Sequence, residues 1–338
     1  MPKIDPRAFS MIPATRRRLL CGGAVALVGL VMPVLGMAQT ATGNWPTKPI
    51  TFVVPQAPGG ANDVIARAVA QGLENSLGQP VIVENRPGAN GNLGTGQVAR
   101  SAGDGYTFLV TAQSAYTINP ALYSKVPFDP IKDFTPVMQL AVAPYLLVVN
   151  PSFPAKNLDE LVAYAKANPG KVEYASAGNG TLNHLLGEML KTQKVIELLH
   201  VPYKGASAAA TDVVAGQLPM TFGSFPGVMP FVTSGKLRVL GVASDKPTSL
   251  APEIAPLGKD LAVTSWYGLF APAGTPDTIV TRMHAAITKV MVAPAMQERL
   301  KTLGAETVLS NPQGFKASLP AELAYWKKVV KESGAHID

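Results

Sequence analysis

The sequence predicts an α/β protein with two lobes around a cleft. Short β-branched apolar runs alternate with amphipathic helical segments, a pattern typical of parallel sheets covered by helices. Two such series follow one another and are joined by apolar crossing segments. A helical tail follows the second series, and we expect it to return to the first lobe.

The first 38 residues have the features of an export signal rather than of a folded element. The basic run Arg16–Arg18 precedes the apolar stretch 19–37, and the small residues at its end predict cleavage near Ala38. The basic run also resembles a twin-arginine signal, with an ordinary secretory signal as the alternative. We therefore expect a cleaved signal peptide at 1–38 and a mature protein in the periplasm.

Composition excludes several classes of function. Cys21 is the only cysteine and lies inside the predicted signal, so the mature chain would hold no disulfide and no thiolate metal ligand. The signal also holds five of the 29 Lys and Arg residues and one of the 22 Asp and Glu residues, which leaves a net charge of +3. That charge is too small to indicate nucleic-acid binding, and the remaining length suits two domains.

The first series starts with the β-branched run Pro49–Pro55, which predicts a buried strand. A glycine-rich turn leads to a predicted helix from Asn62 to Leu77. Its apolar residues recur every four positions and so share one face: Ile65, Val69, Leu73 and Leu77. Further strands are predicted at Pro80–Glu84 and Thr107–Thr111. This order predicts parallel strands with a right-handed crossover.

The second series starts after the apolar run Val142–Val149. Helices are predicted at 157–167 and 179–195, and strands at 172–175, 198–201, 220–223 and 237–243. The segment 206–215 and a short segment with proline and glycine at 226–232 lie between these strands. In the tail, Thr275 is predicted to cap a helix with Pro276 at its first position, and a last helix with Trp326 is expected to pack on the first lobe. The expected division is 39–141 with 265–338 for lobe 1, and 142–264 for lobe 2.

The turn between the first strand and the first helix is a candidate anion site. Two glycines precede a helix N-terminus, where unpaired amide N–H groups and the helix dipole favour a carboxylate. The candidate residues are Pro58, Gly59, Gly60 and Ala61. The alternative is a plain tight turn in which Asn62 or Asp63 caps the helix.

The corresponding turn of the second series has the same chemistry. Ser176, Ala177, Gly178, Asn179 and Thr181 combine small residues, free amides and a helix N-terminus. His184 follows one turn into that helix, where it either reaches the ligand or packs. Two such turns that face each other across a cleft would bind one carboxylate from both lobes.

Two further motifs have stronger structural interpretations. In the motif His200–Gly205, Tyr203 could line the cleft, whereas we expect His200 to be structural and Lys204 to be solvated. The segment Glu84–Gly91 is typical of a turn before another helix, and a structural role is favoured for its arginine.

No catalytic signature occurs in the sequence. It has no Gly-x-Ser-x-Gly elbow, no His-Glu-x-x-His motif and no Walker loop. The segment Gly94–Ala99 fits only the loosest dinucleotide fingerprint and lies well after its strand. Four scattered histidines form no metal-binding pattern. We therefore expect no enzyme activity, no metal and no cofactor.

Six segments together form a specific set: PITFVVPQAPGGANDVIAR, VIVENRPGANGNLG, DGYTFLVT, YASAGNGTLNHL, HVPYKG and SWYGLFAPAGTP. With them the chain resembles the substrate-binding component of tripartite tricarboxylate transporters, the family named for Bordetella uptake genes. The resemblance spans almost the whole mature chain. It implies a two-lobed periplasmic binding protein of the type II class, with the ligand in the interdomain cleft.

The resemblance also implies which residues bind. Family members hold carboxylates through backbone amides and waters of the two turns, which here are Pro58 to Ala61 and Ser176 to Thr181. Variable positions that set specificity follow strands that end at the cleft, and they correspond to Gln113, Ser114, Phe222, Ser224 and Phe225. Gln56 stands where many members have an aromatic residue, which leaves the ligand open.

The function implied is capture of a small organic carboxylate, aliphatic or aromatic, for uptake by a tripartite tricarboxylate-type transporter. The membrane components of that transporter would be its partners. A binding protein that reports to a sensor kinase is the alternative, and a secreted hydrolase is disfavoured by the missing nucleophile motifs. We expect a monomer that binds no nucleic acid.

Overall fold

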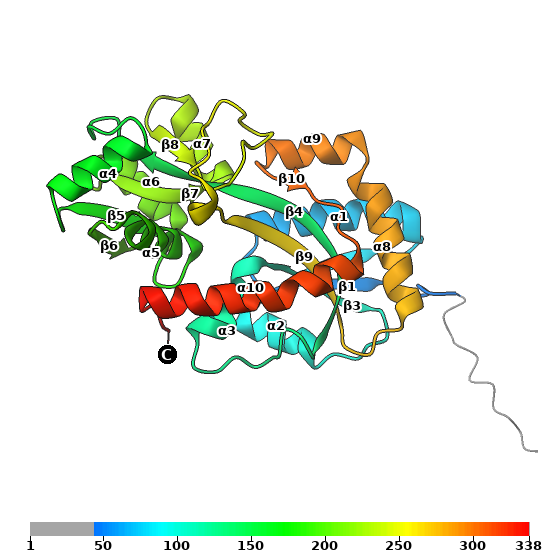
Figure 1. Ribbon diagram of the computed structural model, residues 1–338. Helices are drawn as coiled ribbons and strands as arrows, with labels where there is room; N and C mark the ends of the chain where they lie inside the picture. Colours follow the sequence, from blue (N-terminus) through cyan, green and yellow to red (C-terminus); the bar gives the residue numbers. More distant parts are fainter. Residues whose placement is uncertain (1–43, 338) are drawn as a thin grey trace, which may run out of the picture. The chain divides into compact units, whose positions relative to one another are not determined.

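The structure is a computed structural model that describes residues 44–337. The predicted signal peptide, Cys21 and the cleavage point near Ala38 lie outside these residues. Figure 1 shows the arrangement of the elements. The strands are β1 (Ile50–Val54), β2 (Val81–Asn85), β3 (Thr107–Ala112), β4 (Phe134–Val149), β5 (Val172–Ser176), β6 (Leu198–Pro202), β7 (Met220–Ser224), β8 (Arg238–Val242), β9 (Thr264–Pro272) and β10 (Glu306–Thr307).

The helices lie between these strands and after them. They are α1 (Ala61–Leu77), α2 (Asn92–Ala99), α3 (Asn119–Leu122), α4 (Leu158–Ala167), α5 (Leu182–Lys194), α6 (Ala206–Val214), α7 (Phe225–Thr233), α8 (Asp277–Met291), α9 (Pro294–Thr302) and α10 (Pro312–Ser333), with short helical turns η1 (Ala89–Gly91), η2 (Ser114–Ile118) and η3 (Lys259–Leu261). None of the described helices is both long enough and apolar enough to span a bilayer.

Two half-sheets share the long strand β4. In the first, β1 pairs in parallel with β2 and β3, and β9 joins β3 to the N-terminal half of β4. In the second, β5 pairs in parallel with β6 and β7, and β7 joins the C-terminal half of β4. Helices connect the parallel strands of each half, which confirms the predicted α/β fold with two lobes. The exact lobe boundaries stay a prediction.

The pairing register brings the carboxyl ends of both sets of strands toward the middle of β4. Ala112, at the end of β3, lies opposite Tyr267, which in turn lies opposite Ala141 of β4. Ser224, at the end of β7, lies opposite Tyr145. Because β3 runs parallel to β4 and β7 runs antiparallel to it, the two strands approach each other. Their ends are four β4 residues apart, or about 13 Å along the strand.

The predicted apolar face of α1 is buried as expected. Ile65, Val69, Leu73 and Leu77 are all buried, and they belong to one core with α8. The strand predictions of the first series hold to within one or two residues. β4, however, begins at Phe134, eight residues before the predicted run.

Two predictions about the tail need correction. Thr275 does not cap a helix: its hydroxyl donates to the carbonyl of Pro272 (2.8 Å), and α8 begins at Asp277 with Pro276 before it. The prediction that the last helix packs on the first lobe is incomplete. α10 contacts α3, and its residue Trp326 also belongs to the core built around α5. Figure 1 shows α10 extending from the region of β9 to α5.

Candidate functional site

The first predicted turn is exposed from Ala57 to Gly60 and leads directly into α1. Gly60 is the N-cap residue and no side chain caps the helix, so Asn62 does not have the capping role considered for it. Among residues 44–337, no acceptor bonds to the N–H groups of Gly60 and Ala61. Pro58 has no N–H and offers only its carbonyl. Gly60 and Ala61 are therefore predicted site residues whose amides are available as donors.

Asp63 is buried and anchors this turn to its neighbours. Its carboxylate accepts the N–H of Gly59 (2.9 Å), Nε of Arg67 (3.1 Å) and Nδ2 of Asn85 (2.9 Å). Asn85 also donates to the carbonyl of Gln56 (3.1 Å). Burial alone would raise the pKa of Asp63, but the bonds from Arg67, Gly59 and Asn85 outweigh it and hold that pKa below its usual value. Asp63 thus positions the turn, and Arg67 lies 3.0 Å from its carboxylate and balances its charge.

Replacing Asp63 with asparagine should destabilise the protein by about 1–3 kcal/mol at pH 7, since Gly59, Arg67 and Asn85 lose a charged acceptor. A carboxylate whose pKa is lowered by folding stabilises the folded state at pH values above its pKa in the unfolded chain. This stabilisation is lost as the pH falls through its pKa in the folded protein. The difference in unfolding free energy should therefore be constant from pH 7 to about 5 and shrink below about pH 4. Urea denaturation at several pH values measures it. Asp159→Asn, an exposed acid in the first turn of α4, is the control. A difference that grows in acid would contradict this role.

The second predicted turn is held by hydrogen bonds within itself. The hydroxyl of Ser176 accepts the N–H of Gly178 (3.1 Å), and Thr181 donates to the carbonyl of Gly178 from both Oγ1 (2.7 Å) and its N–H (3.3 Å). Gly178 has a φ of 126°, a conformation that favours glycine. The turn is therefore closed by contacts that involve both the backbone and the side chains of Ser176 and Thr181.

These contacts decide which amides of the second turn remain available. The N–H of Gly178 is engaged by Ser176, and the N–H of Gly180 donates to Nδ1 of His184 (3.0 Å). No acceptor within the described part of the chain bonds to the N–H groups of Ala177 and Asn179. The donors of this turn are thus Ala177 and Asn179, and the amide of Gly178 is not among them.

His184 and Tyr203, both predicted to reach the ligand, have structural partners. His184 is only 7% exposed and supports the turn through Gly180. Tyr203 is half-buried, its N–H donates to the carbonyl of Ser176 (3.0 Å), and its hydroxyl donates to Asp212 (2.7 Å). That bond raises the pKa of Tyr203 to about 12. Direct ligand contacts of these two side chains stay a prediction.

Glu322 of α10 orients the residues that follow β3. It accepts Nε2 of Gln113 (2.7 Å), Oγ1 of Thr117 (2.9 Å) and Nε1 of Trp266 (2.9 Å). Because a carboxylate only accepts, the amide nitrogen of Gln113 must face Glu322. Ser114, the next residue, is half-buried. No local sequence signal marks Glu322, which lies 209 positions from Gln113.

Three further candidate residues lie at or near the end of β7, and they differ in how far their side chains are exposed. Phe222 is fully buried in the core of the second series, and Phe225 is 8% exposed. Ser224 is half-buried and lines a small cavity of about 50 Å³ beside α6 and α7, together with Asn183. Of the three, Ser224 is the side chain with surface to offer a ligand.

His200 was expected to be purely structural, and its position ties it to the second turn. Its Nε2 lies 2.6 Å from Oγ of Ser176, and its ring stacks on that of His184. The parallel pairing of β5 with β6 places His200 opposite Tyr174. Parallel pairing of the two predicted strands 172–175 and 198–201, residue by residue, would already have predicted this position of His200, two residues before the turn begins at Ser176.

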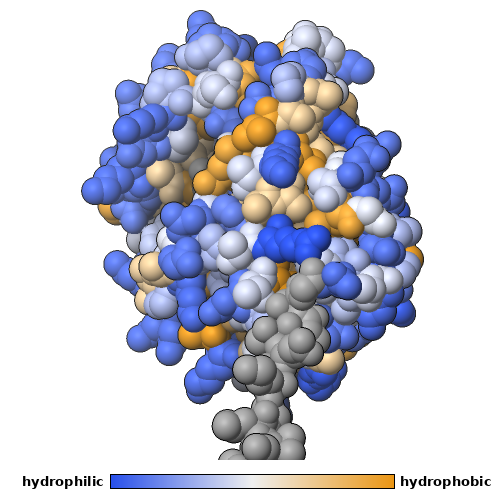
Figure 2. All heavy atoms as spheres, turned by 90° about the vertical axis from the view of Figure 1, so that its right-hand side faces the viewer, coloured by the Kyte–Doolittle hydropathy of each residue, from blue (hydrophilic) through white to orange (hydrophobic). Residues whose placement is uncertain are grey.

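Other surface features lie away from the two turns. Figure 2 looks onto the face where hydrophobic residues gather around a hollow. A groove of about 450 Å³ between α1, α8 and α9 is lined by residues that include Ala68, Val290 and Met296, and by none of the predicted site residues. The described residues hold no group of three or more His, Cys, Asp or Glu side chains placed to bind a metal ion.

Comparison with known proteins identifies the family. Residues 65–335 match the family model described as the tripartite tricarboxylate transporter family receptor. Protein BugT of Bordetella pertussis is 34% identical over 319 residues, which cover 93% of this chain and 98% of BugT. This family is a family of receptors, which is not a class of enzymes.

Solved structures give the same result. The periplasmic binding protein BugD has 33% identity and a TM-score of 0.73, with 86% of this chain and 99% of BugD covered. R. palustris Rpa4515 with adipate has 32% identity and a TM-score of 0.76 (86% and 99% covered). MatC from Rhodopseudomonas palustris with bound malate has 30% identity and a TM-score of 0.72 (85% and 100% covered). The chain is a two-lobed periplasmic solute-binding protein and belongs to the tripartite tricarboxylate transporter receptor family, which includes the Bug proteins.

Proposed function

We propose that this protein captures a small organic carboxylate between its two turns and delivers it to the membrane components of a tripartite tricarboxylate-type transporter. The observation that carries the proposal is the position of the two strand-to-helix turns, which follow β1 and β5. These strands pair in parallel with β3 and β7, whose carboxyl ends approach the midpoint of β4 from opposite directions. Each turn offers amide N–H groups without an acceptor in the described chain: Gly60 and Ala61 on one side, Ala177 and Asn179 on the other. Helix N-termini with free amides are suited to bind a carboxylate.

Neutral donors carry the binding in this proposal. Neither turn contains lysine or arginine, so backbone amides and the helix dipoles of α1 and α5 supply the attraction. Ser114, just after β3, and Ser224, at the end of β7, would contact the part of the ligand away from the first carboxylate. The related structures with adipate and malate support a ligand of this chemical class.

Closure of the two lobes on the ligand would present a surface that the transporter recognises, as in other proteins that close around their ligands. The ligand would be released unchanged, since the family is a receptor family. Mass spectrometry of a carboxylate recovered after incubation with the protein should therefore return the mass that was added.

A thermal-shift screen tests the proposed ligand class. The panel contains aliphatic and aromatic mono-, di- and tricarboxylates, with matched sugars and amines as controls. A carboxylate at 100 times its Kd should stabilise the fold by about 2.7 kcal/mol and raise Tm by several degrees, in proportion to the logarithm of its concentration. Stabilisation by sugars or amines, with no response to any carboxylate, would overturn the proposal.

A further inference from the structure

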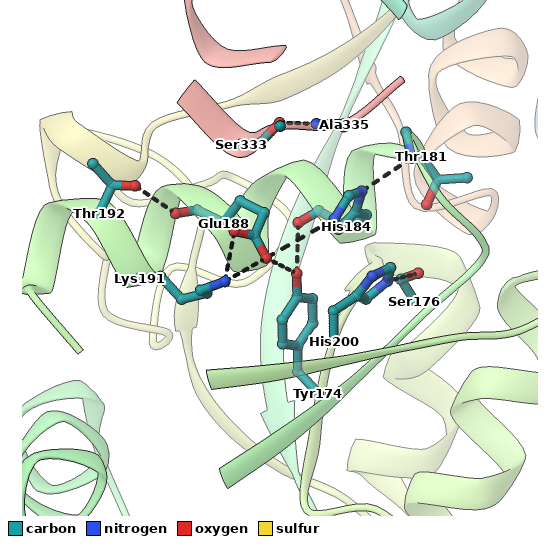
Figure 3. A network of polar contacts seen from close by, with 12 residues as sticks. Tyr174, Ser176, Thr181, His184, Glu188, Lys191, Thr192, His200, Ser333 and Ala335 are labelled. Atoms are coloured by element: carbon teal, nitrogen blue, oxygen red, sulfur yellow. Dashed lines mark hydrogen bonds and ion pairs between the residues drawn. The ribbon is translucent and has the colours of Figure 1, made fainter. Parts of the chain in front are cut away.

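A cluster of polar side chains lies directly beneath the second turn (Figure 3). His184 of α5 and His200 of β6 stack with their ring centroids 3.9 Å apart and their planes 14° apart. Tyr174 of β5 lies against His200 on one side, with centroids 5.0 Å apart. Each histidine contacts the turn: His184 contacts Gly180, and His200 contacts Ser176. The pair thus connects two points of one turn.

The bond to Gly180 fixes the protonation state that His184 needs. Nδ1 of His184 accepts the N–H of Gly180 at 3.0 Å, so this nitrogen carries no proton. A neutral ring must then carry its proton on Nε2, which lies 3.9 Å from Oε1 of Glu188. Protonation at Nδ1 would set two donors against each other. Gly180 is itself buried, so its N–H would lose its acceptor without gaining water in the closed turn.

His200 supports the other end of the turn. Its Nε2 lies 2.6 Å from Oγ of Ser176, and the same oxygen accepts the N–H of Gly178. Because the rings of His184 and His200 are stacked, a charge on one disfavours a charge on the other. The two imidazoles therefore respond to acid as a coupled pair.

The surrounding charges leave burial as the dominant influence on this pair. Glu188 would favour the imidazolium, but it already accepts the hydroxyl of Tyr174 (2.6 Å) and pairs with Lys191 (2.7 Å). β7, which also packs against α5, contributes no ionisable side chain. The ionisable groups nearest the pair are Glu188 and Lys191 of α5 and Tyr174 of β5. The same two elements also carry Lys194 and Glu173, and the groove beside Glu188 is lined by Lys259, Asp260, Tyr325, Lys328 and Glu332.

The bond from Gly180 requires a neutral His184, and the surroundings lower the pKa of both histidines, which favours the neutral rings. Burial lowers the pKa of His184 below its usual value, against an opposing effect of Glu188. Burial, and then the neighbouring His184, lower the pKa of His200 to about 4. A histidine whose pKa is lowered in the closed turn stabilises that turn above about pH 6.5, the ordinary pKa of histidine. This stabilisation is lost as the pH falls toward the pKa that the histidine has in the closed turn. Acid therefore favours an open turn.

We propose that His184 and His200 are positioning residues for the second turn: His184 holds Gly180 in place and His200 holds Ser176, and protonation of His184 in acid opens the turn and weakens ligand binding. Only the last step rests on the proposed function. For one imidazole that regains its ordinary pKa on opening, the ratio of open to closed turns would rise by up to about 25-fold between pH 7 and pH 5.

An NMR titration without ligand tests the positioning role directly. Imidazole ¹⁵N spectra of the four histidines should show His184 neutral at pH 7, with its proton on Nε2. The amide resonance of Gly180 should shift with the same midpoint as the His184 ring, below pH 6.5. In His184→Gln, whose side-chain oxygen can accept the same N–H but does not titrate, this transition should vanish. A Gly180 amide that does not follow His184, or a proton on Nδ1 at pH 7, would overturn the proposal.

Calorimetry with adipate tests the effect on binding. Protonation of adipate itself contributes equally to every variant, so the comparison isolates the protein. Between pH 7 and pH 5, the wild type and His336→Gln, an exposed control, should lose at least about threefold more affinity than His184→Gln. Identical pH profiles for wild type and His184→Gln would contradict the proposed release. Absence of adipate binding to all three proteins would count against the proposed function, and the NMR titration would still decide the positioning role.

Discussion

Replacing Gly178 with valine should weaken carboxylate binding at least about tenfold while the protein still folds. Gly178 has a φ of 126°, which a β-branched residue adopts only under strain, and an added Cβ would lie 3.2 Å from the carbonyl of Tyr203. The backbone must therefore shift, and with it the amides of Ala177 and Asn179. Loss of one hydrogen bond to a charged group costs about 1.5–3 kcal/mol, or about ten- to a hundredfold in affinity.

Three further variants separate the possible causes of such a loss. Gly235→Val introduces the same kind of strain at a positive φ of 71° in the turn before β8, away from the site, and should leave affinity unchanged. Lys204→Ala removes an exposed charge and should also have little effect. Gly60 has an ordinary φ of −73° and room for a Cβ, so Gly60→Val tests obstruction of the first turn alone, with at least about tenfold loss expected. Calorimetry with the carboxylate of largest thermal shift measures all four, and parental affinity in both Gly178→Val and Gly60→Val would contradict the site.

Replacing Trp326 with alanine should lower the free energy of unfolding by about 3–5 kcal/mol, as expected for a large aromatic side chain removed from a core. Trp326 is 1% exposed and belongs to the same core as Leu185 of α5 and Tyr174 of β5. It therefore packs α10 against the elements of the second series. Its Nε1 has no hydrogen-bond partner among the described residues. The predicted loss therefore comes from packing, and no polar contact is broken.

Urea denaturation at pH 7 measures this effect. Lys327→Ala, on the exposed side of the same helix, is the matched control and should change stability by less than about 0.5 kcal/mol. A loss below about 1 kcal/mol for Trp326→Ala would show that the cavity collapses and that α10 is not held through this ring.

The short strands and the amphipathic helices could be predicted because each carries its own local pattern. The strand that joins the two lobes could not be predicted in full. Pro136 and Pro144 lie within β4, and proline normally argues against a strand interior. The pairing of β4 with β9 shifts register between Pro136 and Met138, which allows Pro136 to lie within the strand. This shift depends on the pairing with β9, so the local sequence does not predict it.

The candidate turns were recognised from sequence, but their supports were not. Glycines before a helix N-terminus form a local signal, whereas the contact of Gln113 with Glu322 spans 209 positions. The same holds for the stack of His184 on His200, which depends on the packing of α5 over β6. The sequence also could not show that the amide of Gly178 is engaged by Ser176 and so is not free for a ligand.

The central claim is that amides of both turns hold one carboxylate, and a backbone NMR titration of the full mature chain with adipate tests it most directly. The account predicts that the amide resonances of Gly60, Ala61, Ala177 and Asn179 shift together, with a single Kd from both lobes. Shifts confined to one turn, or to the groove between α1, α8 and α9 near Val290, would contradict it.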